Sequence, residues 1–269
     1  MVFSLALILL IFCGIILVVL IKGAAALNLS MIISVPKGGY YLGREGGVAN
    51  AIVGSLYLAF GASLVSIGIS LPVAFALQKE FIKSRRFSIF SRLMLDVLWG
   101  TPSIVYGAFG FVVMMYFGLR ASLLGGIIVL SLLMMPIMIR SMDEVIRMVP
   151  LEMKESAYAL GTTRLETSLA VILRQALPGI LTAVLLAFGR GIGDAASILF
   201  TAGYTDFIPR SILDPVASLP LAVFFQIGSP VPEVQERAYA SALILLIIVL
   251  LVSVISRILG KRFSKHIIK

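Results

Sequence analysis

The chain has 269 residues, of which 60% are hydrophobic and only 13% are charged, and its mean hydropathy is +1.09. An average soluble domain carries about 25% charged residues, so this composition excludes an ordinary soluble protein and indicates one surrounded by membrane lipid. The formal net charge of +9 is also typical of nucleic-acid-binding proteins. Here the basic residues follow the pattern that orients membrane proteins, so we expect no nucleic acid as a partner.

Residues suited to catalysis or metal binding are scarce. Cys13 is the only cysteine, which excludes an intramolecular disulfide and a multi-cysteine metal site. His266, the only histidine, lies in the basic tail "GKRFSKHIIK", where we expect a solvated or headgroup-level role rather than a part in a hydrolytic triad. No cluster of His, Cys or carboxylate residues offers a catalytic site. We therefore predict that the chain is not an enzyme, has no catalytic residues and binds no metal or cofactor.

Six windows supply the roughly 20 apolar residues that a helix needs to cross the hydrocarbon core. In chain order they are residues 2–21, 49–77, 93–117, 122–139, 176–200 and 238–259. The first window is longer than the apolar core of a signal peptide and no positive segment precedes it, so we predict a retained helix. The predicted fold is all-α: a polytopic membrane protein with about six transmembrane helices, forming one domain over residues 1–269 with its core at 49–259.

The basic residues divide unequally between the loops on the two sides of these windows. Of the 22 Lys and Arg residues, fifteen fall on the side of both termini, six fall on the other side, and Arg190 lies within a window. The positive-inside rule assigns the richer side to the cytoplasm, so both termini are predicted to be cytoplasmic. The two long outer loops, residues 22–48 and 201–237, are rich in Pro and Gly, which is typical of irregular connections. They are either simple links or a docking rim for an extracytoplasmic partner.

The cytoplasmic loop at residues 140–175 is too long for a simple connection. Proline suits a first helical position and glycine suits the left-handed residue after a helix, so we predict a short helix between Pro150 and Gly161. Lys154 is expected among the charged residues on its surface. Four residues spaced three or four apart are predicted to share one face of this helix: Pro150, Met153, Ala157 and Leu160.

A second helix is predicted to begin within the same loop. Thr163 and Glu166 have the spacing of a capping box and precede the apolar run "SLAVIL". The loop therefore reads as a helix, a glycine turn and a second helix. It either lies on the membrane surface or inserts as a knob into a groove of a cytoplasmic protein.

The fifth window contains two charges, in "AFGRGIGDAASILF". A charge near the bilayer centre costs about 2.5–3.5 kcal/mol on insertion scales, so Arg190 and Asp194 are expected to point into the bundle or a watery path. Four residues apart on a helix, they either neutralise each other or serve a substrate. The planar fork of arginine suits phosphate oxygens, so we expect Arg190 to meet an anion and Asp194 to orient it or to pair across a subunit interface. The alternating glycines beside them indicate close packing or a bend.

The third window is interrupted by Thr101, Pro102 and Ser103. A proline at this depth frees backbone groups that protein or water must satisfy. Thr101 and Ser103 are therefore candidates for lining a substrate pathway, and a tolerated kink is the alternative. Asp96 in the same window is expected either to pair with a neighbouring arginine or to lie at an interface.

The stretch "ESAYALG" followed by "LAVILRQALPGI" resembles the EAA motif of ABC-importer permeases. Glu155, Ala157 and Gly161 match this motif in register, while Ser156 replaces an alanine and Arg174 stands where many members have proline. Over about residues 46–205, the chain also resembles phosphate-importer permeases of the PstA type. It is carried by "GGVANAIVGSLYL", "GTPSIVYGAFG", "MMPIMIRSMDEVIRMVP" and "RGIGDAASILFTAG". Asp194 departs from the family, in which this acid is more often glutamate.

The resemblance implies the permease subunit of an ATP-driven importer in the cytoplasmic (inner) membrane of a bacterium or archaeon, with phosphate as the substrate. The implied partners are a second, distinct permease subunit, two ATP-binding subunits docked at the EAA loop, and an extracytoplasmic phosphate-binding protein. The chain lacks the motif Gly-x-x-x-x-Gly-Lys-Ser/Thr, so ATP and Mg²⁺ are expected on the partner ATPase. The alternatives are a permease for another oxyanion, such as sulfate or molybdate, and a stand-alone channel or ion-coupled carrier. A coupled carrier is disfavoured because neither inverted repeats nor several intramembrane acids are visible.

Overall fold

The computed structural model describes residues 2–42, 46–82 and 84–264, and His266 lies outside them. Every regular element of the described residues is helical. In chain order the elements are α1 (Val2–Ala26), α2 (Leu29–Ile33), the 3-10 helix η1 (Tyr40–Leu42), α3 (Ala49–Ala76), α4 (Arg85–Gly100), α5 (Ser103–Tyr116), α6 (Leu123–Arg147), α7 (Leu151–Ala159), α8 (Arg164–Glu166), the π-helix η2 (Thr167–Ile172), α9 (Leu173–Ile192), α10 (Leu219–Ile227) and α11 (Pro232–Ser264).

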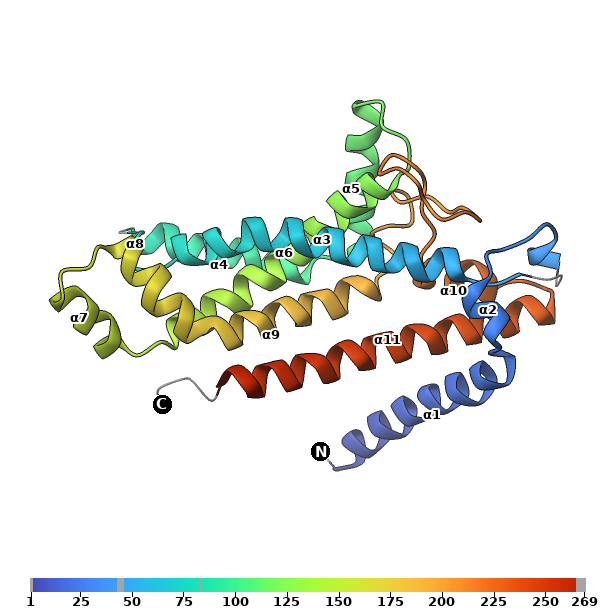
Figure 1. Cartoon of the computed structure of the whole chain (residues 1–269), viewed down its shortest axis with the longest axis horizontal. Coiled ribbons are helices and arrows are strands. Elements are labelled where there is room, and N and C mark those ends of the chain that lie inside the picture. Colours follow the sequence, from blue (N-terminus) through green and yellow to red (C-terminus); the bar gives the residue numbers. More distant parts are fainter. Residues whose placement is uncertain (1, 43–45, 83, 265–269) are drawn as a thin grey trace.

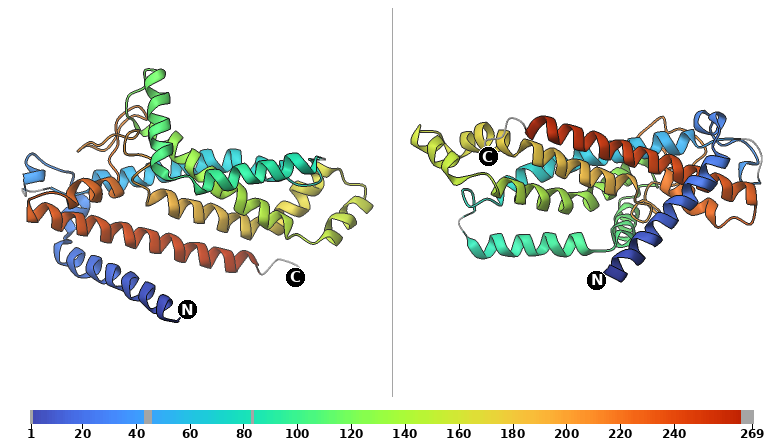
Figure 2. Two further views of the ribbon diagram at one scale, coloured as in Figure 1. Left: turned by 180° about the vertical axis from the view of Figure 1, so that it is seen from behind. Right: turned by 90° about the horizontal axis from the view of Figure 1, so that it is seen from below.

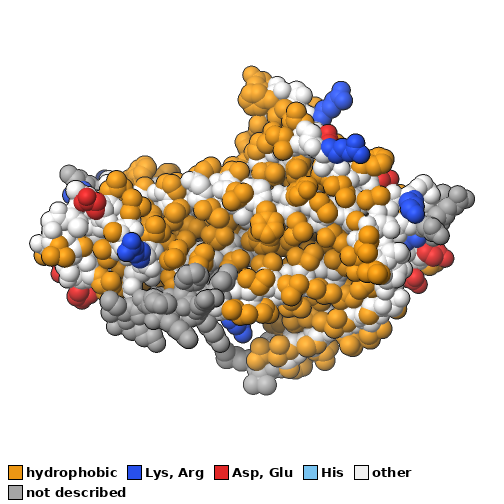
Figure 3. Space-filling model, viewed as in Figure 1, with side chains coloured by type: hydrophobic (Ala, Val, Ile, Leu, Met, Phe, Trp, Pro, Cys, Tyr) orange, Lys and Arg blue, Asp and Glu red, His pale blue; other side chains and the backbone are white. Residues whose placement is uncertain are grey.

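The long helices α3, α6, α9 and α11 run lengthwise in one bundle, and α1 lies along the outside against α11 (Figure 1). One end of the bundle carries α7 and α8, and the other carries α2 and α10. The start of α1 and the end of α11 both lie away from the α2 and α10 end. On the face drawn in Figure 3, hydrophobic side chains cover the middle and most charged ones lie toward the ends or on a protrusion. This distribution is typical of a protein whose middle section is surrounded by membrane lipid.

Within the described residues, five helices are long and apolar enough to cross a membrane: α1, α3, α6, the run Arg164–Ile192 and α11. A sixth span exists only if α4 and α5 are counted together, and these two helices meet at 97°. Residues 93–117, predicted as one interrupted span, fall within this bent pair, and the predicted interruption at Thr101 and Pro102 is confirmed. Both residues have extended ψ angles, 131° and 136°, which end one helix and redirect the chain.

As a result, α5 stands at a right angle to the bundle, and α4 runs along the margin of the bundle (Figure 2). The turns after α9 support α5 in this position. A Cβ atom at Gly107 of α5 would lie 2.7 Å from the carbonyl oxygen of Ala196, so the helix backbone approaches these turns closely. Phe111 and Phe200 add a ring contact with centroids 6.0 Å apart.

The fifth predicted window also differs from the structure. Helix α9 ends at Ile192, and residues 193–202 form turns rather than more helix. The residues after Ile192 are apolar for another reason: they lie in turns whose side chains, such as Ile198 and Ala202, are buried in the core. Gly191 packs closely against Met134 of α6, as the close-packing interpretation predicted, whereas Gly189 has open space around it.

The core lies where α6 crosses α3 and α9. Met134, Met138 and Met142 of α6 are fully buried there, together with Leu58 of α3 and Ala187 of α9. Methionine fills such irregular gaps between helices well, because its side chain is unbranched and polarizable. By contrast, α4 has no buried residue and α1 has none in its membrane-length window.

The two long outer loops are more ordered than the predicted irregular connections, because they contain α2, η1 and α10. They also hold each other in place. The Tyr41 hydroxyl donates to Asp206 over 3.0 Å, and an Arg237 guanidinium nitrogen donates to the Tyr40 carbonyl oxygen over 2.5 Å. Loops joined in this way form a defined surface at the α2 and α10 end.

Two glycines of α3 provide a matched test of this packing. Replacing Gly54 by alanine is expected to destabilise the chain by about 1–3 kcal/mol, because the new Cβ would collide with the Ala217 carbonyl oxygen. Gly68→Ala, on the same helix, meets no atom within 4 Å. It is expected to stabilise the helix by up to about 1 kcal/mol. Thermal unfolding of both variants in detergent measures the difference, and equal midpoints would contradict the packing of α3 against the loop before α10.

Candidate functional site

The charged pair predicted in the fifth window is brought together at the end of α9. Arg190 Nη1 and Asp194 Oδ1 lie 3.5 Å apart, and the two side chains differ sharply in exposure, 53% against 4%. Charge-assisted hydrogen bonds are usually about 2.7–2.9 Å long, so this pair is loose. The guanidinium keeps much of its hydrogen-bonding capacity for another anion.

The geometry corrects one expectation about this pair. Asp194 does not share a helix face with Arg190, because α9 ends at Ile192 with Gly193 as its C-cap. Its other carboxylate oxygen instead accepts a hydrogen bond of 2.8 Å from the Ser197 backbone N–H, which anchors the turn after the helix. Arg190, which was expected to point into the bundle or a watery path, is half exposed on the surface of this chain.

The candidates in the third window lie at the bend between α4 and α5. The Thr101 hydroxyl donates to the Val97 carbonyl oxygen over 2.9 Å, so it provides a hydrogen bond to a backbone carbonyl in the last turn of α4. Thr101 also lines an apolar groove of about 420 Å³ between α4, α5 and α6, together with Tyr106 and Pro136. Ser103 begins α5 and is partly exposed. A pathway role for Thr101 and Ser103 stays a prediction.

Sequence reasoning missed a buried ionic cluster at the α7 end of the bundle. Asp143 of α6 has no exposed surface and accepts two hydrogen bonds from Arg92 of α4, at 2.7 and 2.9 Å. The Gln78 amide, just after α3, donates to the same carboxylate over 2.9 Å. Arg140 of α6 lies 3.5 Å from Asp143. One carboxylate thus joins three segments of the chain.

The expectation that Asp96 pairs with a neighbouring arginine is confirmed. Its carboxylate lies 2.7 Å from Nε of Arg140. Together with Arg92 and Asp143, this pair ties α4 to α6 through polar contacts, whereas α4 buries no side chain. The available indication in the sequence was the pair Arg140 and Asp143, three residues apart in the charged last turns of a helix that is otherwise largely apolar.

The predicted helix-turn-helix is present in the long loop. α7 ends at the C-cap Leu160, and Gly161 follows with a φ angle of +83°, the left-handed conformation that favours glycine. Thr163 and Glu166 form the predicted capping box, with both reciprocal hydrogen bonds. The second helix then continues through six residues of π-helix before α9 begins.

The four residues of the predicted common face of α7 differ in exposure. Ala157 is buried, but Pro150 is exposed, Met153 is partly exposed, and Leu160 is 86% exposed. Glu155 of the motif is exposed as well. The inner face belongs to Ala157 and Lys154, which is 7% exposed rather than on the surface.

Lys154 can be buried because an acidic partner meets it. Its ammonium group lies 2.9 Å from the carboxylate of Glu80, in the connection after α3. Arg164 donates to the Glu80 carbonyl oxygen over 2.8 Å. Burial raises the pKa of Glu80, but the hydrogen bond from Lys154 and the charges of Lys154 and Lys79 outweigh it, so the pKa lies below its usual value. The α7 loop is thus fastened to the bundle by an ionised pair.

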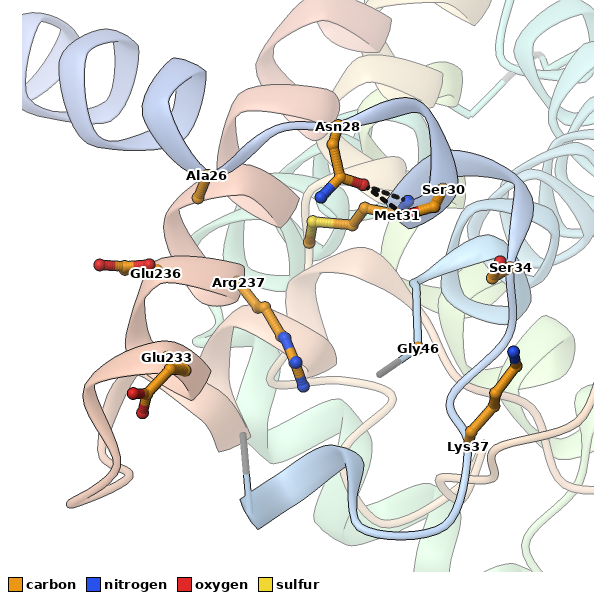
Figure 4. A pocket seen from close by; sticks show the side chains of 10 residues that line it. All are labelled: Ala26, Asn28, Ser30, Met31, Ser34, Lys37, Gly46, Glu233, Glu236 and Arg237. Carbon is orange, nitrogen blue, oxygen red and sulfur yellow. Dashed lines mark hydrogen bonds between the residues drawn. The ribbon is translucent and has the colours of Figure 1, made fainter. Parts of the chain in front are cut away.

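A polar pocket lies at the α2 and α10 end of the bundle, opposite the α7 loop. Figure 4 shows this pocket of about 500 Å³, lined by α2, the loop after it and the start of α11. Lys37 and Arg237 reach it from opposite sides, and Glu233 and Glu236 lie on α11. Arg237 also stacks over the Tyr40 ring, 4.3 Å from its centroid. This end therefore offers mixed charge rather than a purely basic surface.

Comparison with known proteins gives consistent results. A family profile described as "Binding-protein-dependent transport system inner membrane component" matches residues 66–269. The phosphate transport system permease protein PstA of Yersinia pestis is 34% identical over 221 residues, which are 82% of this chain and 74% of that protein. The protein of the same name in Haemophilus influenzae is 30% identical, over 91% of this chain and 86% of that one.

Solved structures share the fold. A chain of the MetNI methionine ABC transporter in an inward-facing conformation superposes with a TM-score of 0.66 at 17% identity, covering 80% of this chain and 95% of that one. A chain of an amino acid ABC transporter superposes with a TM-score of 0.61 at 20% identity, covering 80% and 92%. These neighbours confirm the predicted all-helical permease fold of type I ABC importers.

Proposed function

The chain belongs to the family of inner-membrane components of binding-protein-dependent transport systems, and we propose that it is a permease subunit through which an ATP-driven importer carries inorganic phosphate. Its relatives in Yersinia pestis and Haemophilus influenzae bear the name of phosphate transport permeases. The proposal treats residues 1–269 as a single transmembrane domain, with both termini in the cytoplasm.

The observation that carries the phosphate assignment is the state of Arg190. Its guanidinium is half exposed at the end of a membrane-length helix, and its partner Asp194 holds it only loosely, at 3.5 Å. A planar guanidinium donates two parallel hydrogen bonds to phosphate oxygens. Arg190 receives the anion, and Asp194, fixed by the Ser197 backbone N–H, limits the directions in which the arginine can point.

The partners follow from the two ends of the bundle. ATP-binding subunits, which hold ATP and Mg²⁺ and hydrolyse the nucleotide, dock on the α7 loop through Leu160, Met153 and the motif residue Glu155. A phosphate-binding protein docks on the surface formed by the two outer loops at the opposite end. A second, distinct permease subunit completes the pathway beside Arg190, since the guanidinium faces out of this chain rather than into its own core.

Uptake by the reconstituted importer tests the substrate. Vesicles that contain the chain with its candidate partners are loaded with ATP, and entry of labelled phosphate is measured with and without excess sulfate or molybdate. ATP-dependent phosphate entry that both competitors leave unchanged supports the proposal. Entry that either anion suppresses would assign the permease to another oxyanion, and entry without ATP would favour a channel or a coupled carrier.

Replacing Leu160 by glutamate is expected to uncouple the importer. Burying a leucine side chain at an interface contributes about 1.5–3 kcal/mol, so its loss weakens ATPase docking about tenfold to a hundredfold. The exposed position of Leu160 means that the change leaves the fold of this chain intact. Phosphate-stimulated ATP hydrolysis and co-purification of the ATPase measure the effect. Leu160→Met, which keeps an apolar side chain of similar volume, serves as control, and equal ATPase retention in both variants would contradict this docking surface.

A further inference from the structure

A basic hollow of about 350 Å³ lies at the α7 end of the bundle, apart from the residues assigned to transport. Four segments enclose it: the connection after α3, helix α4, the end of α6 and the start of α7. The residues that line it are Gln78, Lys79, Glu80, Arg92, Arg147, Val149, Leu151 and Lys154. Four of these side chains are cationic and one is anionic.

The ion pairs around the hollow neutralise only part of this charge. Lys154 is paired with Glu80, and Arg92 is paired with Asp143 behind it. No ion pair among the described residues involves Lys79 or Arg147, and both side chains are exposed. Two cations without an ion pair thus line the same hollow, and both would attract a bound anion.

Backbone groups at the start of α7 add to the positive potential. Pro150 is the N-cap of this helix and provides no side-chain acceptor, so the first backbone N–H groups of α7 stay uncapped. Leu151, the first residue of α7, lines the hollow. Free N–H groups at a helix start favour anions, particularly beside cationic side chains.

We propose that this basic hollow binds a phosphate-class oxyanion, with Lys79 and Arg147 as the principal ligands. Two cations without an ion pair match the charge of a phosphate dianion. Inorganic phosphate and a phospholipid headgroup share this chemistry, and both occur at a membrane surface. Because the ligand would touch the first residue of α7, its binding would restrain the loop that carries the EAA-like motif.

Hydrogen exchange of the full chain in lipid nanodiscs tests the proposal without requiring transport. Exchange of the segments 77–82 and 147–154 is followed as inorganic phosphate is titrated at constant ionic strength, in discs of phosphatidylcholine alone and in discs that also contain phosphatidylglycerol. All measurements use the Arg190→Gln background, so that an anion bound near Arg190 does not contribute. Failure of phosphate uptake in a separate experiment would leave this result unaffected.

Phosphate is expected to slow exchange in both segments in phosphatidylcholine discs. The double variant Lys79→Gln/Arg147→Gln should weaken this protection about tenfold or more, since each charged hydrogen bond contributes about 1.5–3 kcal/mol. Lys79→Arg/Arg147→Lys keeps both charges and should retain protection. Arg174→Gln, which removes an exposed cation outside the hollow, should also retain it.

Protection that needs phosphatidylglycerol rather than added phosphate, and that the same double variant abolishes, would identify the headgroup as the source of the oxyanion. Absence of protection under both conditions would overturn the proposal. Equal protection in the double variant and in the chain that keeps Lys79 and Arg147 would also overturn the proposal, because these two residues would then not be the ligands.

Discussion

Replacing Asp143 by alanine is expected to destabilise the chain by about 3–5 kcal/mol, because removal of a buried acid leaves its cationic partners uncompensated. The carboxylate has no exposed surface and is bonded to Arg92 at 2.7 and 2.9 Å and to Gln78 at 2.9 Å. Helix α4 has no buried side chain to hold it in place otherwise. The midpoint of thermal unfolding in detergent measures the loss.

Glu144 provides the control for Asp143. It lies on the same helix and 3.6 Å from Arg140, but its side chain is 61% exposed. Glu144→Gln should therefore change stability by no more than about 1 kcal/mol, as is usual for surface ion pairs. If Asp143→Ala were as mild as Glu144→Gln, the ionic cluster would not be what holds α4 against α6.

Replacing Arg190 by glutamine is expected to reduce phosphate uptake by about tenfold to a hundredfold. A hydrogen bond to a charged group contributes about 1.5–3 kcal/mol, and glutamine loses both the charge and the planar fork. Since the arginine is half exposed and loosely paired, folding should change little. Initial rates of uptake, normalised to the amount of folded importer, measure the effect.

Asp194→Asn separates an anion-binding role of Arg190 from simple neutralisation. Asparagine retains an acceptor for the Ser197 backbone N–H, at 2.8 Å in the parent chain, and so preserves the turn after α9. If Arg190 binds the anion, this variant should keep more transport than Arg190→Gln. Equal loss in both variants, or unchanged transport in Arg190→Gln, would make the two charges a structural pair.

Local patterns with a direct physical cause were predictable from the sequence. The left-handed glycine at Gly161 and the capping box of Thr163 and Glu166 depend on neighbouring residues only, and both are present. The interruption after Thr101 follows from the geometry of the residue before a proline. The composition of the long apolar windows likewise predicted the membrane-length helices.

Features that depend on distant residues were not predictable in the same way. Lys154 appeared to belong on the surface of α7, because nothing nearby in the sequence indicates that Glu80 meets it at 2.9 Å. The prediction that the helix of the fifth window continues beyond Ile192 was wrong for a similar reason. Residues of a buried turn, such as Ile198, are as apolar as those of a membrane helix, so hydropathy does not distinguish them.

Passage of phosphate along the end of α9 is tested most directly by thiol labelling beside Arg190. Replacing Cys13, the only cysteine, by serine permits one new thiol at Gly189, where an added Cβ meets no atom within 4 Å. The rate of reaction with a hydrophilic thiol reagent is measured in the assembled importer with and without phosphate.

The parent chain with its exposed Cys13 on α1 is the control. If phosphate passes this site, Gly189→Cys reacts and phosphate, but not chloride, slows the reaction, while Cys13 shows no phosphate effect. Labelling of Gly189→Cys at the same rate with and without phosphate would contradict passage at this site.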